Sequence, residues 1–208
     1  HDERVDGIQP RSVLEMIGRG SERISEIAAR LNTSVTNLSR VMQLLVTCGF
    51  VTREIPFGES ERTTKKSTYR IIDPVLRFWY RIFSPHRSRW HTYSTDQKTE
   101  LLHQHAGSVL EDELRKIHVD ARRYWESGSA HFELDLVRLR GRKTTGTRVP
   151  VIVSEVKWAR LTPKDRLRIK EEITNKVTKS KLAEKYEVTE IEVMDGDDVI
   201  RKITELQY

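Results

Sequence analysis

The chain has 208 residues, of which 37% are hydrophobic and 33% are charged, a balance that excludes disorder throughout and fits a globular protein. Lysine and arginine number 37 against 31 acidic residues, so the net charge is +6 and favours polyanionic partners such as nucleic acid. No apolar run approaches the roughly 18 residues of a membrane span and no signal peptide opens the chain, so we expect a cytoplasmic protein with no membrane partner.

Apolar residues recur at helical spacing through the first fifty positions. The predicted elements are helices over 11–18, 24–31 and 34–49, followed by β-leaning runs over 50–55 and 67–72. Short helices followed by a basic hairpin are typical of a winged helix-turn-helix domain. Cys48 lies in the apolar end of the last of these helices, so we expect a buried thiol without a disulfide partner.

The polar face of the helix over 34–49 carries residue types that read duplex DNA. Asn37 can pair bidentately with adenine and Arg40 with guanine. Thr36 and Ser39 can donate hydrogen bonds to phosphate. The predicted wing adds cations suited to the DNA backbone or minor groove: Arg62, Lys65 and Lys66. We therefore expect double-stranded DNA as a partner, and the alternative is a winged helix that contacts proteins and leaves this polar face solvated.

An aromatic-rich segment follows the predicted hairpin. Asp73 and Pro74 start a helix that Pro85 ends, and its aromatic residues predict a packing helix between two domains. The predicted division is a winged helix-turn-helix domain with its linking helix over 1–84 and a second domain over 85–208.

Helix and strand patterns alternate in the second half of the chain. The predicted elements are a helix over 97–119 that Gly107 can divide, strands over 131–139 and 149–156 joined by a turn, a helix opened by Thr162 and Pro163, and a strand over 188–194. This order predicts an α+β or α/β fold with a central mixed sheet. In the first strand, alternation puts Leu134 and Leu136 on one face and Glu133 and Asp135 on the other.

The two strands of this predicted hairpin carry acids and a lysine suited to phosphodiester hydrolysis. That reaction with a hard cation requires carboxylates that converge and a positive group beside the phosphate. Glu155 and Lys157 share a face at the end of an apolar run, and Asp135 meets Glu155 if the strands pair. Acid-x-lysine triplets are common by chance and strands often end in charge, so an ordinary charged strand end is the alternative.

A family resemblance supports the catalytic interpretation. The order of Glu111, Asp135 and Ser154-Glu155-Val156-Lys157 resembles the PD-(D/E)XK nuclease superfamily, whose motif is an acid followed at variable distance by acid-x-lysine. More widely, the segments 23–28, 36–40, 69–80 and 155–158 resemble the C-terminal region of prokaryotic, largely archaeal, AAA/STAND-type ATPases. In that family an ATPase module precedes a winged helix and the nuclease-like domain of unknown function 234 (DUF234). The likeness covers about Arg11 to Trp158 and weakens afterwards.

The resemblance implies a nuclease-like α/β domain over 85–208 with a Mg²⁺ or Mn²⁺ site. The implied metal ligands are Asp135, Glu155, the helix-borne Glu111 and the main-chain carbonyl of Val156. Lys157 would orient water or stabilise the transition state. The chain departs from the family pattern, because no proline precedes Asp135, Glu133 could replace a ligand and Glu113 competes with Glu111.

Further features bear on partners. Basic residues of the predicted hairpin are expected to contact DNA: Arg140, Arg142 and Lys143. No phosphate loop of the form G-x-x-x-x-G-K-[ST] occurs, so we expect no ATP site in this chain. Because His1 rather than methionine comes first, we expect a fragment of a larger protein that includes an ATPase module, or a lone descendant. Homo-oligomerisation stays open.

Together these features favour a DNA-binding, metal-dependent nuclease. One alternative is a non-catalytic DNA-binding regulator or ATPase-coupled adaptor that keeps the nuclease fold for DNA contact alone. Another is a toxin-like or defence nuclease that an ATPase module controls.

Overall fold

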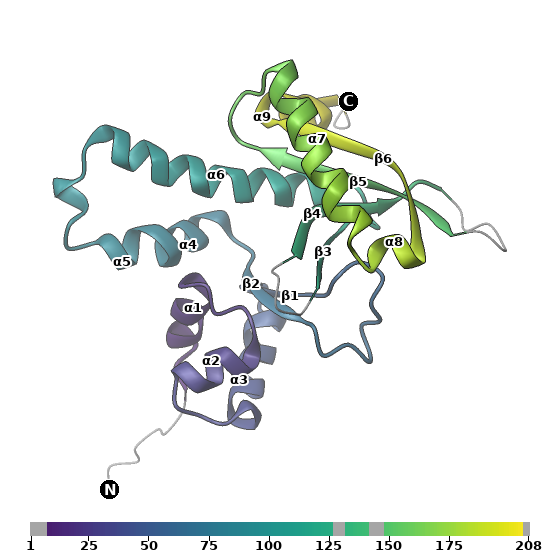
Figure 1. The fold of residues 1–208 in the computed structure, drawn as a ribbon. Coiled ribbons are helices and arrows are strands. Elements are labelled where there is room, and N and C mark those ends of the chain that lie inside the picture. The colour runs from purple at the N-terminus through teal and green to yellow at the C-terminus, as the bar shows by residue number, and fades with distance from the viewer. Residues whose placement is uncertain (1–7, 127–131, 142–147, 206–208) are drawn as a thin grey trace, which may run out of the picture. The chain divides into compact units, whose positions relative to one another are not determined.

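The computed structural model describes residues 8–126, 132–141 and 148–205, and the chain divides into two compact units (Figure 1). Unit 1 holds the residues up to Ile55 together with Glu61–Lys98, and unit 2 holds Pro56–Ser60 together with the residues from Thr99 onward. The sequence placed a boundary at residues 84–85, whereas the contacts divide the chain inside helix α6 (Thr95–Ile117).

Unit 1 begins with a group of helices followed by an antiparallel pair of strands. Its first elements are α1 (Pro10–Gly18), α2 (Ile24–Arg30), α3 (Val35–Thr47), β1 (Val51–Glu54) and β2 (Thr68–Ile71). Ser34 caps α3, because its Oγ accepts a hydrogen bond from the Asn37 amide at 3.1 Å. The expectation of a buried Cys48 is wrong: α3 ends at Thr47, the chain turns at Gly49 with φ of 75°, and the thiol is exposed.

The aromatic-rich segment forms a continuous helical path. It comprises α4 (Pro74–Phe78), a π-helical turn η1 (Trp79–Phe83), α5 (Ser84–His86) and a 3₁₀ turn η2 (Trp90–Thr92). Asp73 caps its start, since Oδ1 accepts from the Leu76 amide at 2.8 Å. Pro85 does not end the helical path as predicted, because it lies in the first turn of α5, where proline is tolerated.

Unit 2 is built on a mixed sheet, in agreement with the α+β class and the central mixed sheet predicted from the sequence. Over its described residues the strand order is β3 (Arg122–Glu126), β4 (Phe132–Leu139), β5 (Val149–Lys157) and β6 (Tyr186–Asp195). The β5–β6 pair is parallel, and the other neighbours are antiparallel. Strand β3 is absent from the elements predicted from the sequence.

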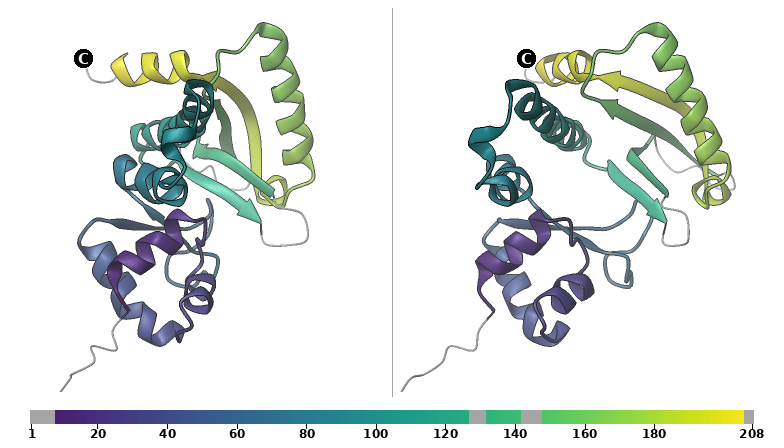
Figure 2. Two further views of the ribbon diagram at one scale, coloured as in Figure 1. Left: turned by 90° about the vertical axis from the view of Figure 1, so that its left-hand side faces the viewer. Right: turned by 60° about the vertical axis from the view of Figure 1, so that its left-hand side comes forward.

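Helices cover both faces of this sheet (Figure 2). The helices of unit 2 after α6 are α7 (Pro163–Thr178), α8 (Leu182–Lys185) and α9 (Gly196–Glu205). On one face, Leu134, Val151 and Val153 pack with Ile169 and Ile173 of α7. On the opposite face, residues of β4, β5 and β6 pack against α6 and α9. Burial on both faces explains why β5 reads as an almost unbroken apolar run.

Helix α6 is continuous, so Gly107 does not divide it as the sequence suggested. Gly107 lies beside Trp158. A Cβ atom added to the glycine would be 3.9 Å from the Cβ atom of Trp158. Ser94 and Gln97 cap the start of α6 reciprocally, with Gln97 N to Ser94 Oγ at 3.2 Å and Ser94 N to Gln97 Oε1 at 2.9 Å. None of the described helices combines the length and apolar composition that crossing a bilayer requires.

Candidate active site

Strand β4 contains a bulge around Asp135. The register of β3 against β4 shifts by one residue between Leu134 and Val137, so β4 holds one more residue there than its partner. As a result, Leu134 and Val137 both pack in the core on the α7 side, while Leu136 packs in the core on the opposite face. The predicted sharing of one face by Leu134 and Leu136 is therefore wrong, because the extra residue breaks the alternation.

Asp135 lies where β4 and β5 stop pairing. Their ladder of paired residues ends at Leu136 opposite Ser154. Beyond this point, Val156 N donates to the Asp135 Oδ2 at 2.9 Å, so a carboxylate takes the place of a strand carbonyl. From α6, Arg115 Nη1 donates to the main-chain oxygen of Asp135 at 2.8 Å. The bulge and these two hydrogen bonds hold the carboxylate at the end of the ladder, beside β5.

Glu155 and Lys157 supply the rest of the cluster from β5. Glu155 is buried at 7% exposure, and Lys157 Nζ donates to its Oε1 at 2.7 Å. Two residues apart on one strand, the side chains share a face as predicted. The Lys157 side chain keeps 43% of its surface exposed, so its ammonium group reaches solvent while the partner carboxylate does not.

Burial and neighbouring acids together set the electrostatics of the cluster. The pKa of the Asp135 carboxyl is raised to about 8. Burial is the largest cause, and the negative charges of Glu155 and Glu111 add to it. The Val156 amide and the Lys157 charge act in the opposite direction. For Lys157, burial lowers the pKa, but the hydrogen bond and charge of Glu155 outweigh it, so the net shift is upward and the amine stays protonated.

The helix-borne acid in this cluster is Glu111. Its charge acts on both Asp135 and Lys157, and it lies 3.8 Å from Arg115 Nη1. Glu113, its competitor in the sequence, instead pairs with Lys116 at 2.6 Å on the exposed side of α6. The other substitute, Glu133, accepts from Arg123 Nε at 2.8 Å. The structure thus brings Asp135, Glu155 and Lys157 together, and Glu111 of α6 is near enough for its charge to act on Asp135 and Lys157.

Sequence reasoning missed one member of the site, Arg115. Its side chain is only 10% exposed, it forms a salt bridge with Asp112, and it holds the β4 backbone at Asp135. A buried guanidinium needs acidic partners. The sequence does contain a signal for this residue. Arg115 follows Glu111 by four residues and Asp112 by three, which predicts ion pairs on one face of a helix.

The cluster can supply only part of the coordination shell of a divalent cation. Among the residues that the structure describes, no group of three or more histidine, cysteine or acidic side chains converges as a complete ligand set. Mg²⁺ commonly takes one or two carboxylates and completes its shell with water and substrate phosphate. Asp135 and Glu155 offer two neighbouring carboxylates, one of them destabilised by like charge, which a cation would relieve.

The predicted DNA-contacting residues of unit 1 are exposed. They are Thr36, Asn37, Ser39 and Arg40 on α3 and Arg62, Lys65 and Lys66 between β1 and β2. Ser39 Oγ donates to the Val35 carbonyl at 2.7 Å, which turns that hydroxyl toward its own helix.

The basic residues predicted to contact DNA from the β4–β5 hairpin are only partly described by the structure. Arg140 is exposed and lies 3.7 Å from Glu190 of β6. Arg142 and Lys143 lie outside the described residues. On α7, Arg166 binds Asp195 and Asp198, so that cation serves the interior of unit 2 rather than an approaching polyanion.

Comparisons with known proteins give no assignment. No protein-family model matches the chain, and searches of curated proteins and of solved structures also find no match. Any function must therefore be inferred from the chemistry of the residues themselves.

Proposed function

We propose that the chain is a DNA-binding, metal-dependent phosphodiesterase whose unit 2 has a PD-(D/E)XK nuclease-like architecture. The observation that carries this proposal is the placement of Asp135 by a bulge at the end of the β4–β5 ladder, beside the Glu155–Lys157 pair. Bulges occur preferentially next to active sites, where they redirect a side chain. A carboxylate with a strongly raised pKa in such a place is typical of a functional site.

Each side chain has a role in this chemistry. Asp135 and Glu155 would hold Mg²⁺ or Mn²⁺ with the Val156 carbonyl, and Glu111 would assist. Such a cation supplies Lewis acidity toward a phosphoryl oxygen and lowers the pKa of a water. The protonated Lys157, anchored by Glu155 and open to solvent, would balance the charge that develops on the phosphate. Arg115 would keep the Asp135 backbone in position.

Unit 1 would deliver double-stranded DNA as a winged helix-turn-helix. Support comes from the succession of α1, α2, α3 and the β1–β2 pair, and from the exposed Asn37 and Arg40 on α3. An ATPase module remains a proposed partner on the strength of the family resemblance.

A second candidate is a non-catalytic DNA-binding regulator or adaptor that retains the nuclease fold. The Glu155–Lys157 ion pair favours it, because this contact already neutralises one carboxylate of the site. In that case the chain would bind DNA in a salt-dependent manner and leave it intact.

The deciding experiment incubates supercoiled and linear DNA with Mg²⁺ or Mn²⁺ and compares the parent with Asp135→Ala and Lys157→Ala. We expect both variants to lose cleavage by at least about 100-fold, as expected for removal of a transition-state contact. Leu167→Ala, which changes an exposed residue of α7, serves as the matched control and should cleave like the parent. Cleavage that neither active-site variant affects would overturn the proposal.

DNA binding by unit 1 is tested separately at two salt concentrations. Lys65→Ala should weaken binding to all duplex sequences alike and lower the salt slope by about one unit. Arg40→Ala should weaken binding in a sequence-dependent way. Salt-sensitive binding by a parent that shows no cleavage would favour the regulator, and binding insensitive to salt would exclude both DNA hypotheses.

A further inference from the structure

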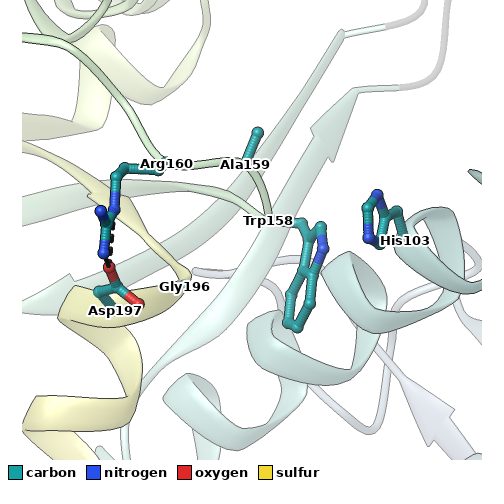
Figure 3. Close-up of a pocket in the computed structure, with 6 residues that line it drawn as sticks. All are labelled: His103, Trp158, Ala159, Arg160, Gly196 and Asp197. Atoms are coloured by element: carbon teal, nitrogen blue, oxygen red, sulfur yellow. Dashed lines mark hydrogen bonds and ion pairs between the residues drawn. The ribbon is translucent and has the colours of Figure 1, made fainter. Parts of the chain in front are cut away.

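A pocket of about 320 Å³ opens at the carboxyl ends of the parallel strands β5 and β6 (Figure 3). It is lined by His103, Trp158, Ala159, Arg160, Gly196 and Asp197. The two strands end together, with Lys157 paired to Asp195, and the chain leaves each of them into the pocket wall. Ligands of open α/β sheets bind in crevices outside the carboxyl ends of strands. The volume is at the small end of the range for ligand sites.

The walls of this pocket suit a flat, heteroaromatic ligand. Trp158 keeps 39% of its surface exposed, although its ring is large and apolar. Its indole lies 5.8 Å from the His103 ring, centroid to centroid, and the two planes are tilted by 43°. The Arg160–Asp197 ion pair, at 2.8 Å, is on the other side of the indole in Figure 3. The pocket therefore combines an aromatic surface for stacking with a polar edge for hydrogen bonds.

Close packing holds Trp158 in place before any ligand arrives. A side chain at Gly196 would come within 3.2 Å of the Trp158 carbonyl oxygen and 3.5 Å of Leu110 Cδ1. The glycine thus lets the start of α9 lie unusually close to Trp158, whose ring atom Cε3 is 3.7 Å from the same position. A pre-formed stacking surface avoids the entropy cost of ordering a mobile ring on binding.

The pocket adjoins the proposed active site. Trp158 directly follows Lys157, the last residue of β5, so their Cα atoms are about 3.8 Å apart, and a bend at Trp158 sets its ring beside His103 of α6. A nucleotide whose phosphate contacts the Lys157 ammonium therefore has its base within reach of the pocket.

We propose that this pocket binds one unpaired nucleobase of the strand whose phosphodiester lies at Lys157. The inference rests on the proposed function and adds to it a substrate class. A base inside a duplex is stacked on both sides and cannot lie against Trp158, so the base must come from a single-stranded tail, a frayed end or a flipped nucleotide. The favoured substrate is duplex DNA that carries an unpaired nucleotide beside the duplex.

The test measures equilibrium binding of fluorescently labelled DNA in EDTA, so that no cleavage is required. The probes are a blunt duplex, the same duplex with a single-stranded tail, and a set of tailed duplexes with one abasic nucleotide at successive tail positions. We expect the parent to prefer the tailed duplex. Trp158→Ala should weaken tailed-duplex binding by about 5- to 150-fold, which is the value of one base–aromatic stack.

Matched variants separate stacking from a general loss of structure. Trp158→Phe should retain most of the affinity, His103→Ala should lose part of it, and Leu167→Ala should bind like the parent. An abasic nucleotide at one tail position should remove the difference between the parent and Trp158→Ala. Equal affinity of Trp158→Ala and the parent for tailed DNA would overturn the inference, as would an equal loss on blunt and abasic probes.

The two proposals can fail independently. Trp158-dependent binding of tailed DNA together with no cleavage by the parent would reject the nuclease and keep the base pocket. Cleavage that depends on Asp135, without any effect of Trp158→Ala on tailed DNA, would keep the nuclease and reject the pocket.

Discussion

Two acid clusters lie at the ends of strands in unit 2, and they handle charge in opposite ways. At the end of β6, Asp195 is 3% exposed and binds Arg166 Nη2 at 2.5 Å, while Asp198 binds Arg166 Nη1 at 2.6 Å. At the end of the β4–β5 ladder, Asp135 lies beside Glu155, whose direct cationic partner is a lysine open to solvent. In one cluster the acids are ionised and held by a shared arginine, and in the other Asp135 has no cation of its own among the described residues and its protonated form is favoured.

The pKa shifts of the two aspartates express this difference. Burial would raise the pKa of Asp195, but amide hydrogen bonds from Leu161 and Asp198 and the charge of Arg166 outweigh it, so the pKa falls below its usual range. Burial and neighbouring acids act together on Asp135, and its pKa rises. The comparison indicates that partners, rather than burial, separate a stabilising acid from one kept for binding.

The largest expected effect comes from Asp135→Asn. Cleavage of DNA should fall by at least about 100-fold, because the amide cannot replace an ionised metal ligand. Stability without metal at pH 7 should rise by roughly 1 kcal/mol, or about 2–4 °C in Tm, because asparagine removes the cost of burying a carboxyl whose pKa the fold raises to about 8, while an oxygen remains for the Val156 amide. Thermal unfolding in EDTA and the cleavage assay measure the two effects. A lower Tm would contradict the raised pKa of Asp135.

Arg166→Ala should act in the opposite sense at the other cluster. It leaves Asp195 buried without its cation, which we expect to cost roughly 2–3 kcal/mol of unfolding free energy. This is below the full range for a buried pair because 33% of the Arg166 side chain is exposed. Urea denaturation provides the measurement, and cleavage per folded molecule should not change. A loss below about 0.5 kcal/mol would show that the network is dispensable.

Acid titration should reveal the acids of unit 2 whose pKa values are lowered, including Asp195 of the Arg166 network. The folded-state pKa values of Asp195 and Glu192 lie below their ordinary values of 3.8 and 4.5, so these acids stabilise the fold fully above that range. As the pH falls below about 4.5, the unfolded chain takes up protons first and the free energy of unfolding declines. Urea midpoints between pH 3 and pH 6 measure this decline in an Asp135→Asn background, because the raised pKa of Asp135 makes stability change in the opposite direction over the same range. Arg166→Ala should show a shallower decline, and an identical pH profile would argue against the assigned pairing.

The smallest effect is expected at an exposed pair. Arg168 and Glu172 of α7 are joined at 2.7 Å, but their side chains are 61% and 56% exposed. Arg168→Ala should change stability by less than about 0.5 kcal/mol, since solvent screens such pairs. Urea denaturation measures this change in the free energy of unfolding. A loss as large as that of Arg166→Ala would remove the distinction between buried and exposed partners.

Much of the secondary structure follows from local signals in the sequence. Ser34 before α3 and Thr162 before α7 are capping residues placed directly ahead of an apolar stripe, and both helices begin where predicted. Strand β3 was missed because Arg122–Glu126 places two cations before two aromatic residues and shows no alternation. Gly107 was misread because its contact with Trp158 comes from a residue about fifty positions away, which no local pattern reveals.

The candidate site was only partly accessible from the sequence. The residues Glu111, Asp135, Glu155 and Lys157 were named because their order resembles a known motif, and the structure brings the last three together with Glu111 nearby. The bulge that positions Asp135 could not be predicted from the sequence. The apolar residues of this strand fit a regular alternation, and nothing in that pattern indicates an extra residue. Trp158 and His103 meet only through the packing of α6 on the sheet, so their pocket could not have been predicted.

The extra residue in β4 makes chain length a constraint of its own. Removing one residue between Leu134 and Val137 would restore regular pairing with β3 but would turn the preceding part of the strand over, so that its apolar residues faced the wrong helix. Substitutions at Asp135 can leave the fold intact, whereas a single deletion beside it exchanges the two faces of the strand before it. Related chains that keep this centre should therefore vary in residue type here more readily than in spacing.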